Sequence, residues 1–196
     1  MGLKRVIANY KEFWNIAGIG EIARRYFAMN SFDDVLMVLG ILLAGFFGNI
    51  LEKGVIITAV IGATIAAIIS GFLGTYLTET AERESQIKRL EKKVSIRLRK
   101  SPIGKAHRFA IFVLAVGNSG EDLLISLLIL IPFFIKTLVI QQAYLFSIIA
   151  AFVILLLIGV FLGKISKENL FKTGVKMIIT GVICAILIFL VDKLIK

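Results

Sequence analysis

The stretch GVIITAVIGATIAAIISGFLGTYL, from Gly54 to Leu77, decides the fold class. It contains 24 residues without a single Asp, Glu, Lys or Arg. An α-helix rises about 1.5 Å per residue, so about 20 apolar residues cross the roughly 30 Å of hydrocarbon in a bilayer. A run of this length and composition predicts a transmembrane helix rather than the core of a soluble domain.

Four further apolar runs of similar length lie on either side of this stretch. They cover residues 35–51, 109–135, 143–163 and about 175–191. Of the 196 residues, 58% are hydrophobic, against about half in an ordinary soluble domain. The sequence therefore predicts an all-α polytopic membrane protein with five transmembrane helices, and these helices leave no room for a second globular domain.

The first thirty residues alternate basic and apolar positions. Val6, Tyr10 and Trp14 recur at helical spacing with Lys and Arg between them. The segment lacks the uninterrupted apolar core and the cleavage site of a signal peptide. We expect residues 1–30 to form an N-terminal amphipathic helix in the membrane interface, and residues 31–196 to form the transmembrane transporter domain.

The net charge of +10 follows a membrane topology rather than a nucleic-acid surface. Five Lys and Arg residues precede the first run, ten lie between Arg83 and Arg108, and four lie between Lys164 and Lys176. Only four lie elsewhere, in the alternate loops and near the C-terminus. Basic residues accumulate in the cytoplasmic loops of membrane proteins. The distribution predicts a cytoplasmic N-terminus, a C-terminus outside the cell membrane, and no nucleic-acid partner.

The loop between the second and third runs is predicted to contain a charged cytoplasmic helix. The helical pattern continues beyond the second run until Ser101 and Pro102 interrupt it. We expect this helix to cover about residues 79–100, with Glu79 and Glu82 on one face where the chain leaves the membrane. These two carboxylates are candidates for collecting cytosolic cations.

A repeated motif places acidic residues inside two of the runs. The sequence NSFDDVLM begins at Asn30, and NSGEDLLI begins at Asn118, 88 residues later. A second echo pairs residues 74–79 with residues 163–168. The chain therefore reads as two parallel two-helix repeats plus a fifth helix. Transporters commonly place their ion site where such repeats meet.

The side chains of each motif share one helix face at spacings of three, four and seven residues. A carboxylate at mid-bilayer costs about 2.5–3.5 kcal/mol, and basic partners are scarce in these runs, so a bound cation or proton is the simplest compensation. For Asp33 and Asp34 of the first motif, the alternative to a bound cation or proton is that they lie at the cytoplasmic interface and are solvated there. Carboxylate and amide oxygens suit hard divalent ions, and a Met thioether tolerates Fe²⁺ or Mn²⁺, although this Met is equally suited to core packing. The candidate metal-binding residues are Asn30, Asp33, Asp34, Met37, Glu79, Glu82, Asn118, Glu121 and Asp122.

The residues that commonly carry enzymatic chemistry are scarce. The chain has one His and one Cys, and no Ser/His, Cys/His or His-rich constellation is present. We therefore expect no enzyme and no resident cofactor, with protons and divalent metal ions as the species handled in the lipid bilayer.

Three stretches resemble the vacuolar iron transporter family, and in particular its short prokaryotic branch. They are Gly20 to Asp33, Gly74 to Glu82, and Gly163 to Met177. The resemblance implies five transmembrane helices, a homodimer with the ion path between protomers, and proton-coupled export of Fe²⁺ or Mn²⁺ from the cytosol. It further implies that Asp33 corresponds to the family's pore aspartate, and Glu82 to a glutamate of its metal-collecting helix.

The chain departs from that family at several positions. Asp34 stands where the family usually has Gly, Gly71 replaces the pore methionine of helix two, and the cytoplasmic insert is short. Glu121 and Asp122 are more acidic than the family norm, and their motif also faintly resembles small cadmium-resistance exporters. The sequence predicts a divalent-cation transporter, and leaves open an exchanger for calcium or a toxic soft metal, or a non-transporting membrane scaffold or insertase-like protein.

Overall fold

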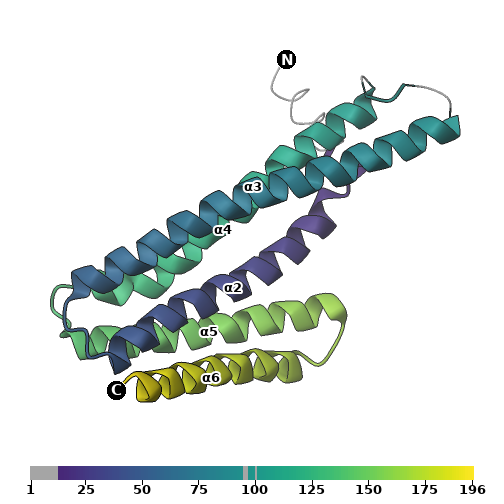
Figure 1. The fold of residues 1–196 in the computed structure, drawn as a ribbon. Coiled ribbons are helices and arrows are strands. Elements are labelled where there is room, and N and C mark those ends of the chain that lie inside the picture. The colour runs from purple at the N-terminus through teal and green to yellow at the C-terminus, as the bar shows by residue number, and fades with distance from the viewer. Residues whose placement is uncertain (1–12, 95–96, 100) are drawn as a thin grey trace. The chain divides into compact units, whose positions relative to one another are not determined.

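The computed structural model describes residues 13–94, 97–99 and 101–196, and the regular secondary structure of these residues is α-helical (Figure 1). Five of its helices are long and apolar enough to cross a membrane. The prediction of an all-α chain with five candidate membrane-spanning helices is therefore confirmed. The helices are α2 (Ile19–Phe47), α3 (Lys53–Val94), α4 (Pro102–Phe134), α5 (Ile140–Ser166) and α6 (Leu170–Ile195).

The longest helix, α3, combines an apolar span and a charged extension without interruption. Its 42 residues correspond to a length of about 63 Å, twice the thickness of the hydrocarbon layer. The charged helix expected at about residues 79–100 falls on the continuation of α3, which ends at Val94. Residues 97–99 are not helical, and the Glu91 carboxylate accepts hydrogen bonds from the backbone N–H groups of Leu98 and Arg99 at 2.6 and 3.3 Å.

The third long helix, α4, begins seven residues before the apolar run that predicted it. Ser101 precedes it, and its Oγ accepts a hydrogen bond from the backbone N–H of Gly104 at 3.4 Å. Pro102 occupies the first helical position, where its missing N–H costs nothing. This start places His107 and Arg108 within the helix.

The predicted N-terminal interfacial helix is described only in part. Its first twelve residues lie outside the described residues, and residues 13–16 are helical. Gly18, in the turn that follows, has φ 61°, a backbone conformation that glycine adopts without steric penalty. The helix α2 then runs through residue 30 without a break. The interfacial location of residues 1–30 stays a prediction.

The chain divides into two compact units. The first consists of Met1–Phe27 and Ile68–Gly120, and the second of Ala28–Ala67 and Glu121–Lys196. The core of the first unit gathers small and aliphatic side chains, including Ile19, Ala106, Ala110 and Leu114. The core of the second unit is larger and includes the fully buried Val35, Leu39, Leu42, Ile129 and Leu155.

Within the second unit, α5 and α6 lie side by side (Figure 1). A Cβ atom added to Gly159 would lie 2.6 Å from the Cα atom of Gly174, so the two backbones are in contact there. Lys167 ends α5 in the left-handed region at φ 55°. Asn169 then begins α6, because its side chain accepts hydrogen bonds from two backbone N–H groups of the first turn.

Candidate functional site

Three acidic side chains of the repeated motifs are buried in the second unit. Asp34 on α2 is 5% exposed, and Glu121 and Asp122 on α4 are 7% and 4% exposed. The carboxyl groups of Asp34 and Asp122 lie close enough to share a hydrogen bond, and Glu121 is their electrostatic neighbour. Asp34 Oδ2 and Glu121 Oε1 have no hydrogen-bond partner among the described residues. We call these three residues the carboxylate cluster.

Hydroxyl groups occur one helical turn from members of the carboxylate cluster. Ser31 lies one turn before Asp34 on α2, is fully buried, and its Oγ has no partner among the described residues. Ser126 lies one turn after Asp122 on α4 and accepts a hydrogen bond of 2.8 Å from the Thr64 hydroxyl. The same helix faces therefore present neutral oxygen atoms beside the carboxylates.

No basic side chain neutralises the carboxylate cluster through an ion pair within the part of the chain that the structure describes. The ion pairs found there join Arg83 to Glu79, Arg99 to Glu84 and Lys196 to Asp192. Among the same residues, no group of three or more His, Cys, Asp and Glu side chains is arranged as a ready-made metal site. The cluster is thus a set of buried oxygen donors rather than a closed metal cage.

The other predicted ligands of the first motif lie outside the cluster. Asp33 is exposed on α2, whereas its neighbour Asp34 is buried. Asn30 and Met37 are partly exposed, and Met37 packs against the apolar core of the second unit. Successive helix residues point about 100° apart, and on α2 it is Asp34 that faces inward and Asp33 that faces outward.

Asn118, the neutral residue of the second motif, belongs to the first unit. Its Nδ2 donates hydrogen bonds to Thr75 Oγ1 at 2.9 Å and to the Gly71 carbonyl oxygen at 3.4 Å. Both acceptors are on α3, so the amide joins α4 to α3 within this unit. The structure gives Asn118 a cross-linking role between helices.

Glu79 and Glu82 on α3, predicted to act together, lie in different environments. Glu79 is 5% exposed and accepts hydrogen bonds from Tyr26 Oη at 3.0 Å and Arg83 Nε at 2.8 Å. Glu82 is exposed, and its Oε1 accepts a hydrogen bond of 3.2 Å from Gln86. Glu79 is therefore held by a cation and a phenol, whereas Glu82 faces outward.

Sequence reasoning missed the residues that surround Glu79. The Arg83 guanidinium also donates to the Ala17 carbonyl oxygen, at 3.3 and 3.4 Å, and His107 is buried with its Nδ1 lacking a partner among the described residues. The spacing of four residues between Glu79 and Arg83 is an available signal for their ion pair. The contribution of Tyr26, 53 residues away, has no such local signal.

The chain matches no family model. It is similar to the uncharacterized protein MJ0645 of Methanocaldococcus jannaschii, with 33% identity over 179 residues. The matched region covers 89% of this chain and 91% of the relative. The similarity thus extends along almost the whole of both chains and is not confined to one motif.

Proposed function

The chain belongs to the same family as the MJ0645 protein, and we propose that it moves a divalent metal cation across the membrane in exchange for protons. The observation that carries this proposal is the carboxylate cluster of Asp34, Glu121 and Asp122, buried on two helices long and apolar enough to span a membrane. Carboxylates in that setting are costly, and in membrane proteins they commonly mark ion and proton pathways.

The close contact between Asp34 and Asp122 supports the exchange mechanism. Two carboxyl groups share a hydrogen bond only when one of them carries a proton, because an ionised carboxylate accepts but does not donate. A divalent cation that enters between the two groups displaces this proton and neutralises both charges. Metal and protons would therefore compete for the same oxygen atoms.

The donor atoms of the cluster favour hard cations. Carboxylate oxygens, with the hydroxyls of Ser31 and Ser126 one turn away, suit Mn²⁺, Fe²⁺ and Ca²⁺ rather than soft metals. Fe²⁺ or Mn²⁺ is proposed first because of the resemblance to the vacuolar iron transporters. Ca²⁺ is the second candidate, since the cluster contains only oxygen donors. An incomplete set of protein ligands suits a transported ion, which must leave its site as well as enter it.

The arrangement of the repeats and the orientation in the membrane belong to the same proposal. Asp34 and Asp122 occupy equivalent positions of the two motifs, 88 residues apart, and they are the pair in contact. This pairing supports two parallel repeats that meet at the ion path. The basic loops support a cytoplasmic N-terminus and export from the cytosol. A homodimer is proposed from the family resemblance.

Transport of Mn²⁺ into proteoliposomes tests the proposal directly. We expect Asp34→Asn, Asp122→Asn and Glu121→Gln each to lower the initial rate at least about tenfold, because each removes a charge that the cation must balance. Asp192→Asn is the matched control, since Asp192 is an acid of the second unit that pairs with Lys196. A protein that acts only as a scaffold would show no flux above empty liposomes in any of these preparations.

The variant Asp33→Asn distinguishes the pore residue implied by the family resemblance, Asp33, from the buried carboxylate cluster seen in the structure. If Asp33 is the pore aspartate that the resemblance implies, its replacement abolishes flux and Asp34→Asn has the smaller effect. If the buried cluster carries the ion, the order is reversed, because Asp33 is exposed and Asp34 is buried. Equal rates for all of the acidic variants and the control would contradict a transport site in this cluster.

A further inference from the structure

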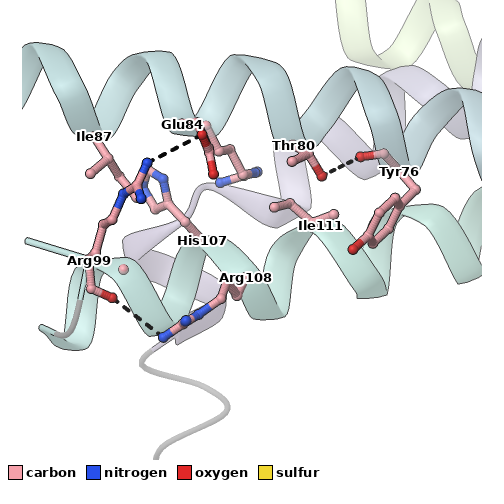
Figure 2. Close-up of a pocket in the computed structure, with 10 residues that line it drawn as sticks. Tyr76, Thr80, Glu84, Ile87, Arg99, His107, Arg108 and Ile111 are labelled. Carbon is pink, nitrogen blue, oxygen red and sulfur yellow. Dashed lines mark hydrogen bonds and ion pairs between the residues drawn. The ribbon is translucent and has the colours of Figure 1, made fainter.

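A pocket of about 280 Å³ lies in the first unit, between the charged extension of α3 and the first turns of α4 (Figure 2). Three arginines line it: Arg83 from α3, Arg99 from the segment before α4, and Arg108 from α4. Glu84 is the acidic residue of the lining. The pocket is separate from the carboxylate cluster, all of whose members belong to the second unit.

Two of the arginines keep most of their hydrogen-bonding capacity. Arg99 Nη2 contacts Glu84 Oε2 at 3.4 Å, and both side chains are more than half exposed, so this ion pair is weak. Arg108 Nη2 donates to the Arg99 carbonyl oxygen at 3.4 Å (Figure 2). A guanidinium has five N–H donors. Within the part of the chain that the structure describes, most of these donors on Arg99 and Arg108 have no protein acceptor and remain for a ligand.

His107 on α4 is one of the residues that line the pocket. The residue is 7% exposed, and its Nδ1 has no hydrogen-bond partner among the described residues. A buried polar atom left unsatisfied is costly, and such atoms are rare in native proteins. Nδ1 accepts from a hydroxyl when the ring is neutral and donates to an anion when it is charged. A phosphate oxygen accepts from Nδ1–H in the charged ring, or in the neutral tautomer that carries its proton on Nδ1.

We propose that this pocket binds a phosphate group, either of an anionic lipid headgroup or of a soluble phosphate compound. Arginine is the side chain best suited to phosphate, because its planar guanidinium donates two parallel hydrogen bonds. The first turns of α4 add the positive end of the helix dipole. Basic pockets between membrane helices at the cytoplasmic side recognise lipid headgroups. The site is independent of whether the protein transports a metal ion.

Native mass spectrometry of the full chain in neutral detergent tests whether a lipid headgroup binds in the pocket. With phosphatidylglycerol and phosphatidylcholine added in turn, we expect one phosphatidylglycerol to be retained per protomer. Arg99→Gln and Arg108→Gln should each weaken this binding about tenfold, as for the loss of a charged hydrogen bond. Lys105→Gln is the matched control, because Lys105 is an exposed cation of α4 that does not line the pocket.

Isothermal titration calorimetry of delipidated protein with inorganic phosphate and pyrophosphate tests the soluble occupant. Binding that Arg99→Gln and Arg108→Gln weaken and Lys105→Gln leaves unchanged, together with no preference between the two lipids, assigns the pocket to a soluble phosphate compound. Retention of phosphatidylglycerol without binding of either free anion assigns it to a lipid headgroup.

The variant Glu84→Gln distinguishes a specific effect on phosphate binding from a loss of folded protein, because it should make binding tighter. The change removes a carboxylate that competes for Arg99 and repels an anion, so we expect about threefold tighter binding in whichever experiment responds. A misfolded variant would not bind more tightly. The proposal is overturned if the wild type binds in neither experiment, if the arginine variants behave like Lys105→Gln, or if Glu84→Gln weakens binding.

Discussion

Glu79 and Arg83 form an ion pair whose side chains are 7% and 4% exposed, in a helix long and apolar enough to cross a membrane. Each charge neutralises the other. In addition, the Glu79 carboxylate accepts a hydrogen bond from the Tyr26 hydroxyl, and the Arg83 guanidinium donates one to the Ala17 carbonyl oxygen. A buried pair with its hydrogen bonds complete is tolerated, but either charge alone is not. This arrangement gives Glu79 a structural partner and distinguishes it from Asp34, Glu121 and Asp122.

Removing one member of this pair should be more harmful than removing both. We expect Arg83→Met to lower the free energy of unfolding by about 3–5 kcal/mol, because it leaves the Glu79 carboxylate buried and uncompensated. The double variant Glu79→Leu with Arg83→Met should recover a large part of this loss. Reversible denaturation in detergent measures both. If the double variant is less stable than Arg83→Met, the pair stabilises the fold outright, contrary to this expectation.

Sequence patterns located the acidic residues of the site but not the direction in which each one faces. The repeated motif identified Asp33, Asp34, Glu121 and Asp122, and three of these four are buried. Two adjacent acids on a helix fit an inward-facing stripe almost equally well, so periodicity alone does not choose between Asp33 and Asp34. The partner of Glu79 on α2 depends on tertiary packing, which no local pattern encodes.

At the scale of helices, the apolar runs predicted the existence of the spans better than their ends. Each of the five helices overlaps a predicted run, yet α2, α3 and α4 all extend into charged sequence. A hydropathy pattern marks where lipid begins, whereas a helix ends where its backbone groups find other partners. The Glu91 carboxylate and the Ser101 hydroxyl provide such partners between α3 and α4.

The close approach of α5 and α6 depends on Gly159. A Cβ atom at this position would lie 2.6 Å from the Gly174 Cα and 2.8 Å from the Thr173 carbonyl oxygen, both backbone atoms that cannot rotate away. We expect Gly159→Leu to separate the two helices and to lower the midpoint of thermal unfolding in detergent by several degrees. Gly62→Leu on α3 is the control, because nothing lies within 4 Å of its added Cβ atom. Equal shifts for the two variants would contradict a packing role for Gly159.

At the scale of the whole molecule, the chain carries two chemically opposite sites that have one helix, α4, in common. The carboxylate cluster in the second unit suits cations, and the arginine-lined pocket in the first unit suits anions. Both use α3 or α4, which pass from one unit to the other near Ala67 and Gly120. Whether each helix crosses the bilayer decides what these sites have access to, so the topology is the property to test.

Two loops separated by three helices provide that test. Glu52 precedes α3 and Glu168 follows α5, and both are exposed. In a Cys184→Ser background, which removes the single native cysteine, we expect a membrane-impermeant maleimide to label Glu52→Cys from outside intact cells and Glu168→Cys only after the cells are opened. If α3, α4 and α5 all cross, the two positions must lie on opposite sides, because an odd number of crossings separates them. Labelling on the same side would mean that one of the three does not span. Opposite sides with the reverse order would agree with α3, α4 and α5 all crossing and would overturn only the orientation inferred from the basic loops.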